Sequence, residues 1–167
     1  MSTTSLVSIE EYLAASFPDG DCDYLEGQIL ERNVGEVDHA DVQTRVDRFL
    51  GAHYPQFWSA VEVRVQVRER RFRVPDLCLV TGDKPKTRTV AEPPFLVVEV
   101  LSPEDRMSEM QERIDDYLDF GVSFVWVIDP AALRALVHTF EGSREIRDGI
   151  LRTSQPTIEI PLHELFR

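Results

Sequence analysis

The chain has 167 residues, of which 43% are hydrophobic and 29% charged, values typical of one soluble globular domain spanning residues 1–167. Its formal net charge of −12 excludes a passive nucleic-acid coat protein, which would normally be basic. No apolar run approaches the roughly 18 residues of a membrane span and the N-terminus lacks the pattern of a signal peptide, so we expect a cytoplasmic protein without a membrane partner.

The hydrophobic pattern predicts helices and strands along the whole chain. Ser8 and Glu11 form a capping-box pattern that opens a first helix, and the strict alternation VEVRVQVR at 61–68 is the clearest strand signal. The continuous apolar run at 122–130 is typical of a strand covered on both faces. In chain order we predict helices at 9–16, 38–53 and 105–120, strands at 23–32, 61–68, 72–80, 95–101, 122–130, 134–140, 149–153 and 157–160, and a closing helical turn.

This order of elements predicts an α/β or α+β domain with a mixed central sheet flanked by helices. One helix, at 105–120, connects the strands at 95–101 and 122–130. Those two strands should therefore be parallel, with a right-handed connection.

Two of the predicted strands each carry one carboxylate inside an apolar segment: Asp76, behind Pro75 in RFRVPDLCLV, and Glu99 in PFLVVEVLSP. An unpaired charge is expensive to bury there. Two carboxylates on neighbouring strands can share a divalent cation, and hard oxygen ligands suit Mg²⁺. Such an ion would polarise a phosphate and generate hydroxide, the requirements of phosphodiester hydrolysis. The alternative is a capping or salt-bridged pair of acids with arginines as partners.

On the helix predicted at 105–120, Arg106 and Arg113 fall on one side, along an edge of the apolar stripe. If the stripe packs on the sheet, these cations would overlook the ends of the strands that carry the two acids. They would then stabilise a phosphate or neutralise Glu99. The alternative is a surface ion pair with Glu109, worth only about 0.2–0.5 kcal/mol.

Positive charge is concentrated in RVQVRERRFR at 64–73, which holds five arginines against Glu69 alone. Arg73 and the loop cations could follow a DNA backbone and add salt-dependent affinity. A solvated hairpin face explains the same residues equally well. The loop cations are Lys84, Lys86 and Arg88.

The segments RVPDLCLV, PPFLVVEVLSPEDR and YLDFGVSFVWVIDP together resemble the Uma-type putative restriction endonuclease family of the PD-(D/E)XK nuclease superfamily. The resemblance covers nearly the whole chain, from IEEYL through DYLEGQIL and His39 to the closing HELF. It implies a restriction-endonuclease-like core in which Asp76 and Glu99 bind Mg²⁺ or Mn²⁺.

The superfamily's usual lysine, two residues after the glutamate, is Leu101 in this chain. The resemblance places the cation instead at Arg113 on the following helix, where the family usually has lysine. A guanidinium stays protonated near neutral pH. Arg113 therefore suits a role in orienting water or stabilising charge. If the reaction requires this side chain to transfer a proton, we expect the arginine to abolish activity.

These features predict a Mg²⁺-dependent endonuclease that hydrolyses phosphodiester bonds in DNA, with Asp76, Glu99 and Arg113 as its catalytic residues. A homodimer is expected by analogy, since nucleases of the superfamily often pair subunits. The alternative is a catalytically silent nucleic-acid-binding or regulatory domain, which Arg113 and the acidic total charge favour. Weaker candidates for the cleft, each with a surface or capping alternative, are Arg73, Arg106, His39, Glu26 and Asp23.

Overall fold

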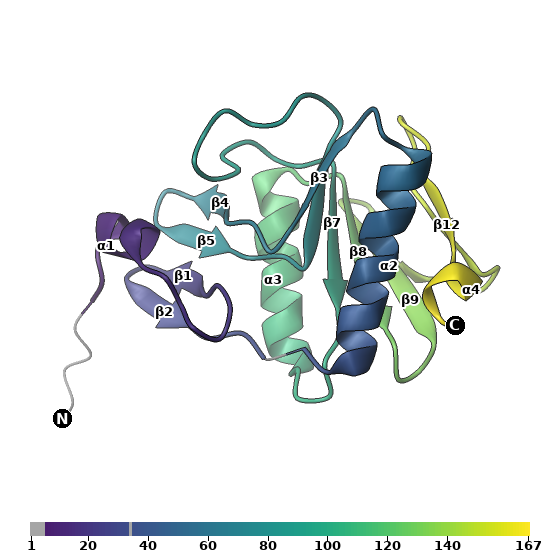
Figure 1. Cartoon of the computed structure of the whole chain (residues 1–167), viewed down its shortest axis with the longest axis horizontal. Coiled ribbons are helices and arrows are strands. Elements are labelled where there is room, and N and C mark those ends of the chain that lie inside the picture. The colour runs from purple at the N-terminus through teal and green to yellow at the C-terminus, as the bar shows by residue number, and fades with distance from the viewer. Residues whose placement is uncertain (1–5, 34) are drawn as a thin grey trace.

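The computed structural model describes residues 6–33 and 35–167 (Figure 1). A mixed six-stranded sheet lies at its centre, with the strand order β10-β9-β8-β7-β6-β3. β7 and β8 are parallel and joined through one helix, as predicted, and the other neighbouring strands are antiparallel. The strands are β3 (Trp58–Val61), β6 (Leu77–Val80), β7 (Leu96–Val100), β8 (Phe124–Asp129), β9 (Arg134–Thr139) and β10 (Gly142–Glu145).

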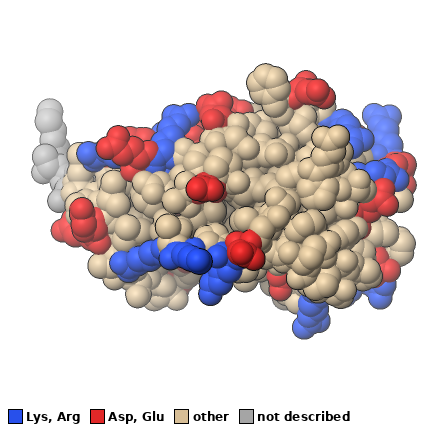
Figure 2. Space-filling model, turned by 90° about the horizontal axis from the view of Figure 1, so that it is seen from above, with Lys and Arg blue, Asp and Glu red and all other residues tan. Residues whose placement is uncertain are grey.

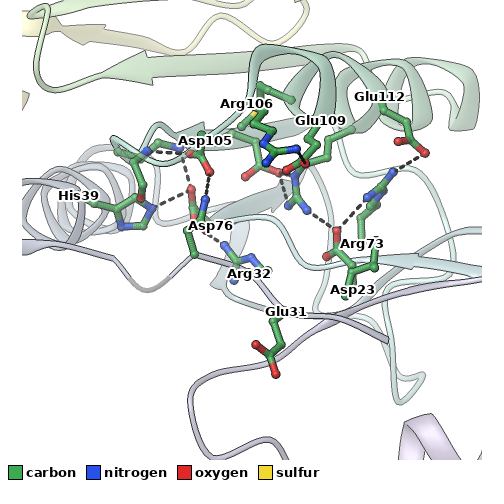
Figure 3. A pocket seen from close by; sticks show the side chains of 17 residues that line it. Asp23, Glu31, Arg32, His39, Arg73, Asp76, Asp105, Arg106, Glu109 and Glu112 are labelled. Carbon is green, nitrogen blue, oxygen red and sulfur yellow. Dashed lines mark hydrogen bonds and ion pairs between the residues drawn. The ribbon is translucent and has the colours of Figure 1, made fainter. Parts of the chain in front are cut away.

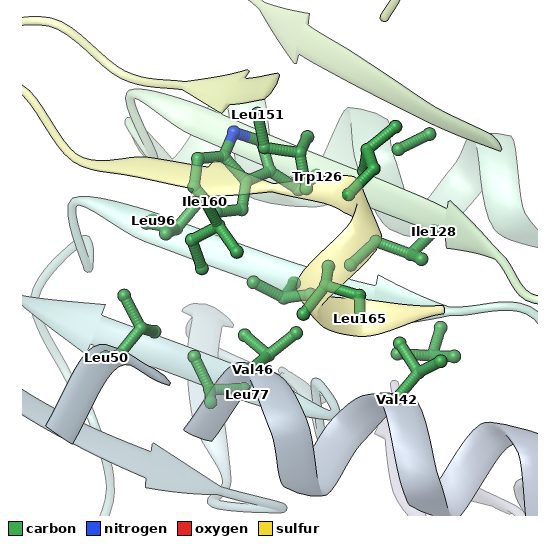
Figure 4. Close-up of a cluster of buried hydrophobic side chains, with 14 of the residues drawn as sticks. Val42, Val46, Leu50, Leu77, Leu96, Trp126, Ile128, Leu151, Ile160 and Leu165 are labelled. Atoms are coloured by element: carbon green, nitrogen blue, oxygen red, sulfur yellow. The ribbon is translucent and has the colours of Figure 1, made fainter. Parts of the chain in front are cut away.

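Helices α2 (Val37–His53) and α3 (Met107–Phe120) cover opposite faces of this sheet (Figure 1). Because side chains alternate along a strand, β7 serves both faces. Its residues Leu96, Val98 and Val100 belong to the core beneath α2, shown in Figure 4, while Val97 belongs to the core beneath α3. Glu99 has the same parity as Val97 and therefore points towards α3.

A second sheet, antiparallel and four-stranded, has the order β2-β1-β5-β4 and lies beside the first (Figure 1). Helix α1 (Ile9–Ala14) packs on it through aromatic rings, and those of Tyr12 and Tyr24 stack at 5.0 Å between centroids. Its strands are β1 (Asp23–Leu25), β2 (Gln28–Leu30), β4 (Val65–Arg68) and β5 (Arg71–Arg73). The chain ends with β11 (Ile150–Arg152), β12 (Glu159–Pro161) and α4 (Leu162–Leu165), which contribute side chains to the core beneath α2.

Three predicted strands are each divided. The run at 61–68 breaks at Glu62, whose φ of 49° turns the chain out of β3 and towards β4. The run at 72–80 breaks at Pro75, between β5 and β6, because proline offers no N–H to a sheet. The run at 23–32 is a hairpin that turns at Gly27, with φ of 101°.

The two breaks at Glu62 and Pro75 occur where the chain crosses between the sheets. The amide of Glu62 donates to the carbonyl of Asp76 at 3.2 Å, so the two crossings lie side by side. Asp76 therefore sits at the junction of the sheets. The sequence pattern did not predict β10, and of β3 it included only Val61 in a predicted strand.

The predicted fold class, a mixed α/β domain with a central sheet between helices, is confirmed. Over residues 6–33 and 35–167, we find no helix with the length and apolar character needed to cross a membrane.

Candidate active site

A cavity of about 320 Å³ lies at the carboxyl end of β7, next to the N-terminal parts of α2 and α3 (Figure 3). Charged side chains from both sheets and both helices line it. They include Asp23, Glu31, Arg32, His39, Arg73, Asp76, Glu99, Asp105, Arg106, Glu109, Glu112 and Arg113.

Asp76, immediately before β6, and Glu99, on β7, both reach this cavity. Leu77 lies opposite Val98 in the β6–β7 register, and one further step along this antiparallel pair sets Asp76 opposite Glu99. The amide of Val100 donates to Oδ2 of Asp76 at 2.7 Å, which fixes the aspartate against β7. Both acids are 2% exposed.

Besides the Val100 amide, one imidazole and one guanidinium contact the Asp76 carboxylate. Nε2 of His39 lies 3.2 Å from its Oδ2, and Nη2 of Arg32 contacts its Oδ1. Burial acts to raise the pKa of Asp76, but the His39 hydrogen bond and the Arg32 charge outweigh it and hold that pKa below its usual value. Asp76 is therefore ionised and already paired.

Glu99 is held through one of its two oxygens. Oε1 accepts hydrogen bonds from the Tyr117 hydroxyl at 2.6 Å and from Nη2 and Nε of Arg113 at 2.7 and 3.1 Å. Among the residues that the structure describes, none donates to Oε2 of Glu99. Burial raises the pKa of Glu99, and Arg113 opposes that shift.

Arg113 links two acids and the backbone. Besides Glu99, its guanidinium contacts Asp23 and donates to the carbonyl of Val74 at 2.9 Å. Asp23 also accepts from Nη1 of Arg73 at 3.0 Å and from the Val74 amide at 2.8 Å. The salt-bridged alternative to the metal site thus describes these contacts accurately: Asp23, Asp76 and Glu99 each have an arginine partner.

The structure brings most of the predicted site residues together. Asp76, Glu99, Arg113, Arg73, His39 and Arg106 all line the cavity, as does the weaker candidate Asp23. Arg106 lies at the exposed start of α3, with its side chain 79% exposed and 3.9 Å from Glu109, as the surface alternative predicted. Figure 3 shows the two side by side.

Glu26 lies outside the lining of this cavity. It occupies the turn between β1 and β2, with φ of 49°, and pairs with Arg71 at 3.0 Å. The surface alternative proposed for Glu26 matches this position. Sequence reasoning missed Arg32, which follows β2 without any pattern, and it assigned Tyr117 only to the apolar stripe of its helix.

The arginine-rich run at 64–73 is largely neutralised within the fold. Arg64 pairs with Asp21 at 2.6 Å, Arg71 with Asp116 at 2.9 Å, and Arg73 with both Asp116 and Asp23. Ion pairs inside the domain, rather than a free basic surface, account for most of this local charge.

The loop cations lie away from the cavity. The loop at 81–94 joins the end of β6 to the start of β7, at the edge opposite the carboxyl end of β7 (Figure 1). Figure 2 views the molecule from this side and shows a short row of Lys and Arg side chains beside scattered acidic ones. The loop therefore does not extend the cavity's own surface.

Comparison with known proteins decides the family. The Uma2 family model, described as a putative restriction endonuclease, matches residues 9–164. The chain belongs to the Uma2 family. This confirms the resemblance found in its sequence, and the family and fold support a nuclease function.

A solved structure shares the fold of this Uma2 protein. It is the crystal structure of a putative nuclease belonging to DUF820 from Anabaena variabilis ATCC 29413, at 1.96 Å resolution. It matches with a TM-score of 0.78 over 96% of this chain and 97% of that chain, at 17% sequence identity. No curated protein matches this Uma2 sequence.

The donor chemistry in the Uma2 cavity fits a hard divalent ion. Within residues 6–33 and 35–167, no three or more His, Cys, Asp or Glu side chains are arranged as a metal-binding group. Mg²⁺, however, usually keeps several waters and binds through one or two carboxylates plus substrate phosphates. Asp76 and Glu99, the latter with Oε2 free of hydrogen-bond donors, meet that requirement.

Proposed function

We propose that this chain is a Mg²⁺- or Mn²⁺-dependent endonuclease that hydrolyses phosphodiester bonds in DNA. The observation that carries this proposal is the placement of Asp76, immediately before β6, opposite Glu99 on β7, in one charged cavity, with the Val100 amide holding Asp76 in place. Two such carboxylates would hold the ion. When bound, the ion supplies a Lewis acid for the phosphate and lowers the pKa of water.

The protein's own residues orient this chemistry. Tyr117 and Arg113 fix Oε1 of Glu99, which leaves Oε2 for the ion. Contact with Asp23 and Glu99 raises the pKa of Arg113 far above its already high value despite burial, so Arg113 cannot accept a proton. Arg113 acts instead by positioning Glu99. Arg106, exposed at the mouth, would contact a phosphate of the substrate.

Cutting both strands of a duplex would need two such sites. We therefore propose a homodimer in which the cavity of each subunit cuts one of the two strands. Measuring the molar mass in solution, with and without duplex DNA, tests this part separately.

One observation favours a second candidate, a catalytically silent nucleic-acid-binding or regulatory domain. Arg32 contacts Asp76 and Arg113 contacts Glu99, so both acids are neutralised without an ion. In a silent domain these pairs would be permanent. Removing a carboxylate would then leave DNA affinity unchanged or higher, because a negative charge near phosphate is lost.

Plasmid nicking with and without Mn²⁺ separates the two candidates. We expect metal-dependent nicking by the wild type and loss of nicking in Glu99→Gln. The matched control is Glu141→Gln, which changes an exposed glutamate at the β9–β10 turn. Equal nicking by wild type and Glu99→Gln would contradict the proposal, and folded protein that never nicks would support the silent domain.

A further inference from the structure

The buried ion pairs at the base of the cavity balance without any ion, although the whole lining holds seven acidic side chains against four arginines. Three buried carboxylates face three guanidinium groups, and every acid in this set is paired with at least one of them. The acids are Asp23, Asp76 and Glu99, and the bases are Arg32, Arg73 and Arg113. A divalent cation would add two positive charges to this buried, neutral set, which is unfavourable unless a cation withdraws or an anion joins.

Of the three arginines, Arg32 is the one held least firmly. Its side chain is 18% exposed, against 11% for Arg113 and 4% for Arg73. Arg113 makes five hydrogen bonds, to Asp23, Glu99, Tyr117 and the Val74 carbonyl. Within the described residues, the guanidinium of Arg32 hydrogen-bonds Asp76 alone.

Arg32 also has room to move. It lies between the main cavity and a second cavity of about 230 Å³, and it lines both of them, together with Asn33 and His39. Its guanidinium can therefore leave Asp76 without displacing a packed side chain of the core. Arg106 and Asp105, in the main cavity, mark the exposed side from which a substrate would approach.

We propose that Arg32 exchanges partners during the reaction cycle and is a substrate-contacting residue of this site. Without metal it occupies the edge of Asp76 that a divalent ion would use. When metal and nucleic acid bind together, Arg32 transfers to a phosphate oxygen, for which a guanidinium has matching bidentate geometry. This inference rests on the proposed function, since it requires metal at Asp76 and Glu99.

The exchange makes metal binding and phosphate binding mutually dependent. Metal alone must displace Arg32 and leave it without an anion, whereas metal arriving with a phosphate supplies one. An arginine that only stabilised the fold would support metal binding and nicking alike. An exchanging arginine instead opposes metal binding in the free protein and promotes the reaction on DNA.

The test is a calorimetric titration of Mn²⁺ into wild type, Arg32→Gln and the control Arg45→Gln, combined with single-turnover nicking at saturating Mn²⁺. Arg45 is a suitable control because, among the residues that the structure describes, it pairs only with Asp41 at the surface of α2. We expect Arg32→Gln to bind Mn²⁺ on the order of tenfold more tightly, a normal size for coupled sites, yet to nick at least about tenfold more slowly for want of a phosphate contact. Arg45→Gln should match wild type in both measurements.

Mn²⁺ affinity in Arg32→Gln that is unchanged or lower than in wild type would overturn the exchange. If Arg32→Gln does not fold, Arg32→Lys takes its place, and it should bind Mn²⁺ more tightly than wild type because an ammonium loses the fork geometry. Glu99→Gln separates the two proposals. Mn²⁺ binding that depends on Glu99 but not on Arg32 refutes the exchange alone, and binding indifferent to Glu99 refutes the metal site and the exchange with it.

Discussion

Nη2 of Arg113 lies 2.7 Å from Oε1 of Glu99, and the same guanidinium contacts Asp23 on the neighbouring sheet. One side chain of α3 thus ties β7 to β1 across the junction where Asp76 sits. Its fork of donors reaches the two carboxylates from separate nitrogens, whereas a lysine offers all of its donors from one atom. Arginine at this position, where the resemblance implied lysine, has a structural counterpart in the contact with Asp23.

Arg113→Lys should therefore destabilise the protein without accelerating nicking. We expect a loss of about 1–3 kcal/mol in the free energy of unfolding, because Asp23 or Glu99 loses one of its buried partners. Urea unfolding measures this, with Arg45→Lys as the surface control, where about 0.5 kcal/mol or less is expected. A stable Arg113→Lys protein that nicks faster than wild type would show that lysine fits and that arginine impairs catalysis.

The positions of the two acids could be predicted because the sequence isolates them. A charge among Val97, Val98 and Val100 needs a partner, and Pro75 marks the point where the ladder of the sheet is interrupted. The position of Arg113 beside the apolar stripe of its helix could be predicted from the helical repeat of hydrophobic residues alone. Nothing in these patterns, however, distinguishes a carboxylate that awaits a metal from one already paired with arginine.

The strand boundaries could not be predicted, for a related reason. Alternation of valine at 61–68 persists while the backbone passes from β3 to β4, although only Val65 and Val67 are buried and Val61 is 45% exposed. The positive φ at Glu62 that redirects the chain has no signal in a non-glycine residue. Likewise, formal charge reveals the arginines at 64–73 but not the distant acids that neutralise them.

His39 should make stability depend on pH in metal-free protein. Burial disfavours its charged form, but the hydrogen bond and attraction to Asp76 outweigh this and raise the pKa of His39. A pKa higher in the folded than in the unfolded state means that protonated His39 stabilises the fold fully below about pH 6.5, and that this contribution is lost as pH rises through the raised value.

Thermal unfolding in EDTA across pH 5.5–9, compared between wild type and His39→Gln, measures this effect. The stability difference between the two proteins should shrink steadily as the pH increases. His163→Gln is the control, since His163 lies exposed near the C-terminus. A difference that stays constant with pH would mean that folding does not shift the pKa of His39, and a difference that grows with pH would mean that folding lowers it.

Arg64 should prove structural despite its place in the basic run. Its guanidinium makes paired contacts with Asp21 at 2.6 and 2.7 Å, donates to the Tyr12 carbonyl at 3.1 Å and lies 4.3 Å from the centre of the Tyr12 ring. Arg64→Gln should lower the free energy of unfolding by about 2–3 kcal/mol. It should leave the salt dependence of DNA binding unchanged.

Arg70 provides the contrast, because its side chain is exposed on the β4–β5 turn. Arg70→Gln should leave stability within about 0.5 kcal/mol of wild type. If the hairpin follows DNA, the slope of log affinity against log salt should fall by roughly 0.9 for that one contact. The opposite pattern, with Arg64→Gln changing the slope and leaving stability intact, would restore the basic run as a DNA surface.

The two cysteines should report on opening of the two sheets. Cys78 on β6 is fully buried, and burial raises its pKa to about 12; Cys22, beside β1, is 4% exposed, and burial also raises its pKa. Because the thiolate is the reactive species, neither should react with a disulfide reagent at pH 8 while the protein is folded. In urea both should react at once. Substituting each cysteine singly by alanine would assign the labelling reaction to one thiol or the other. Rapid labelling of Cys78 in native protein would show that β6, and with it Asp76, is not held as tightly as these contacts require.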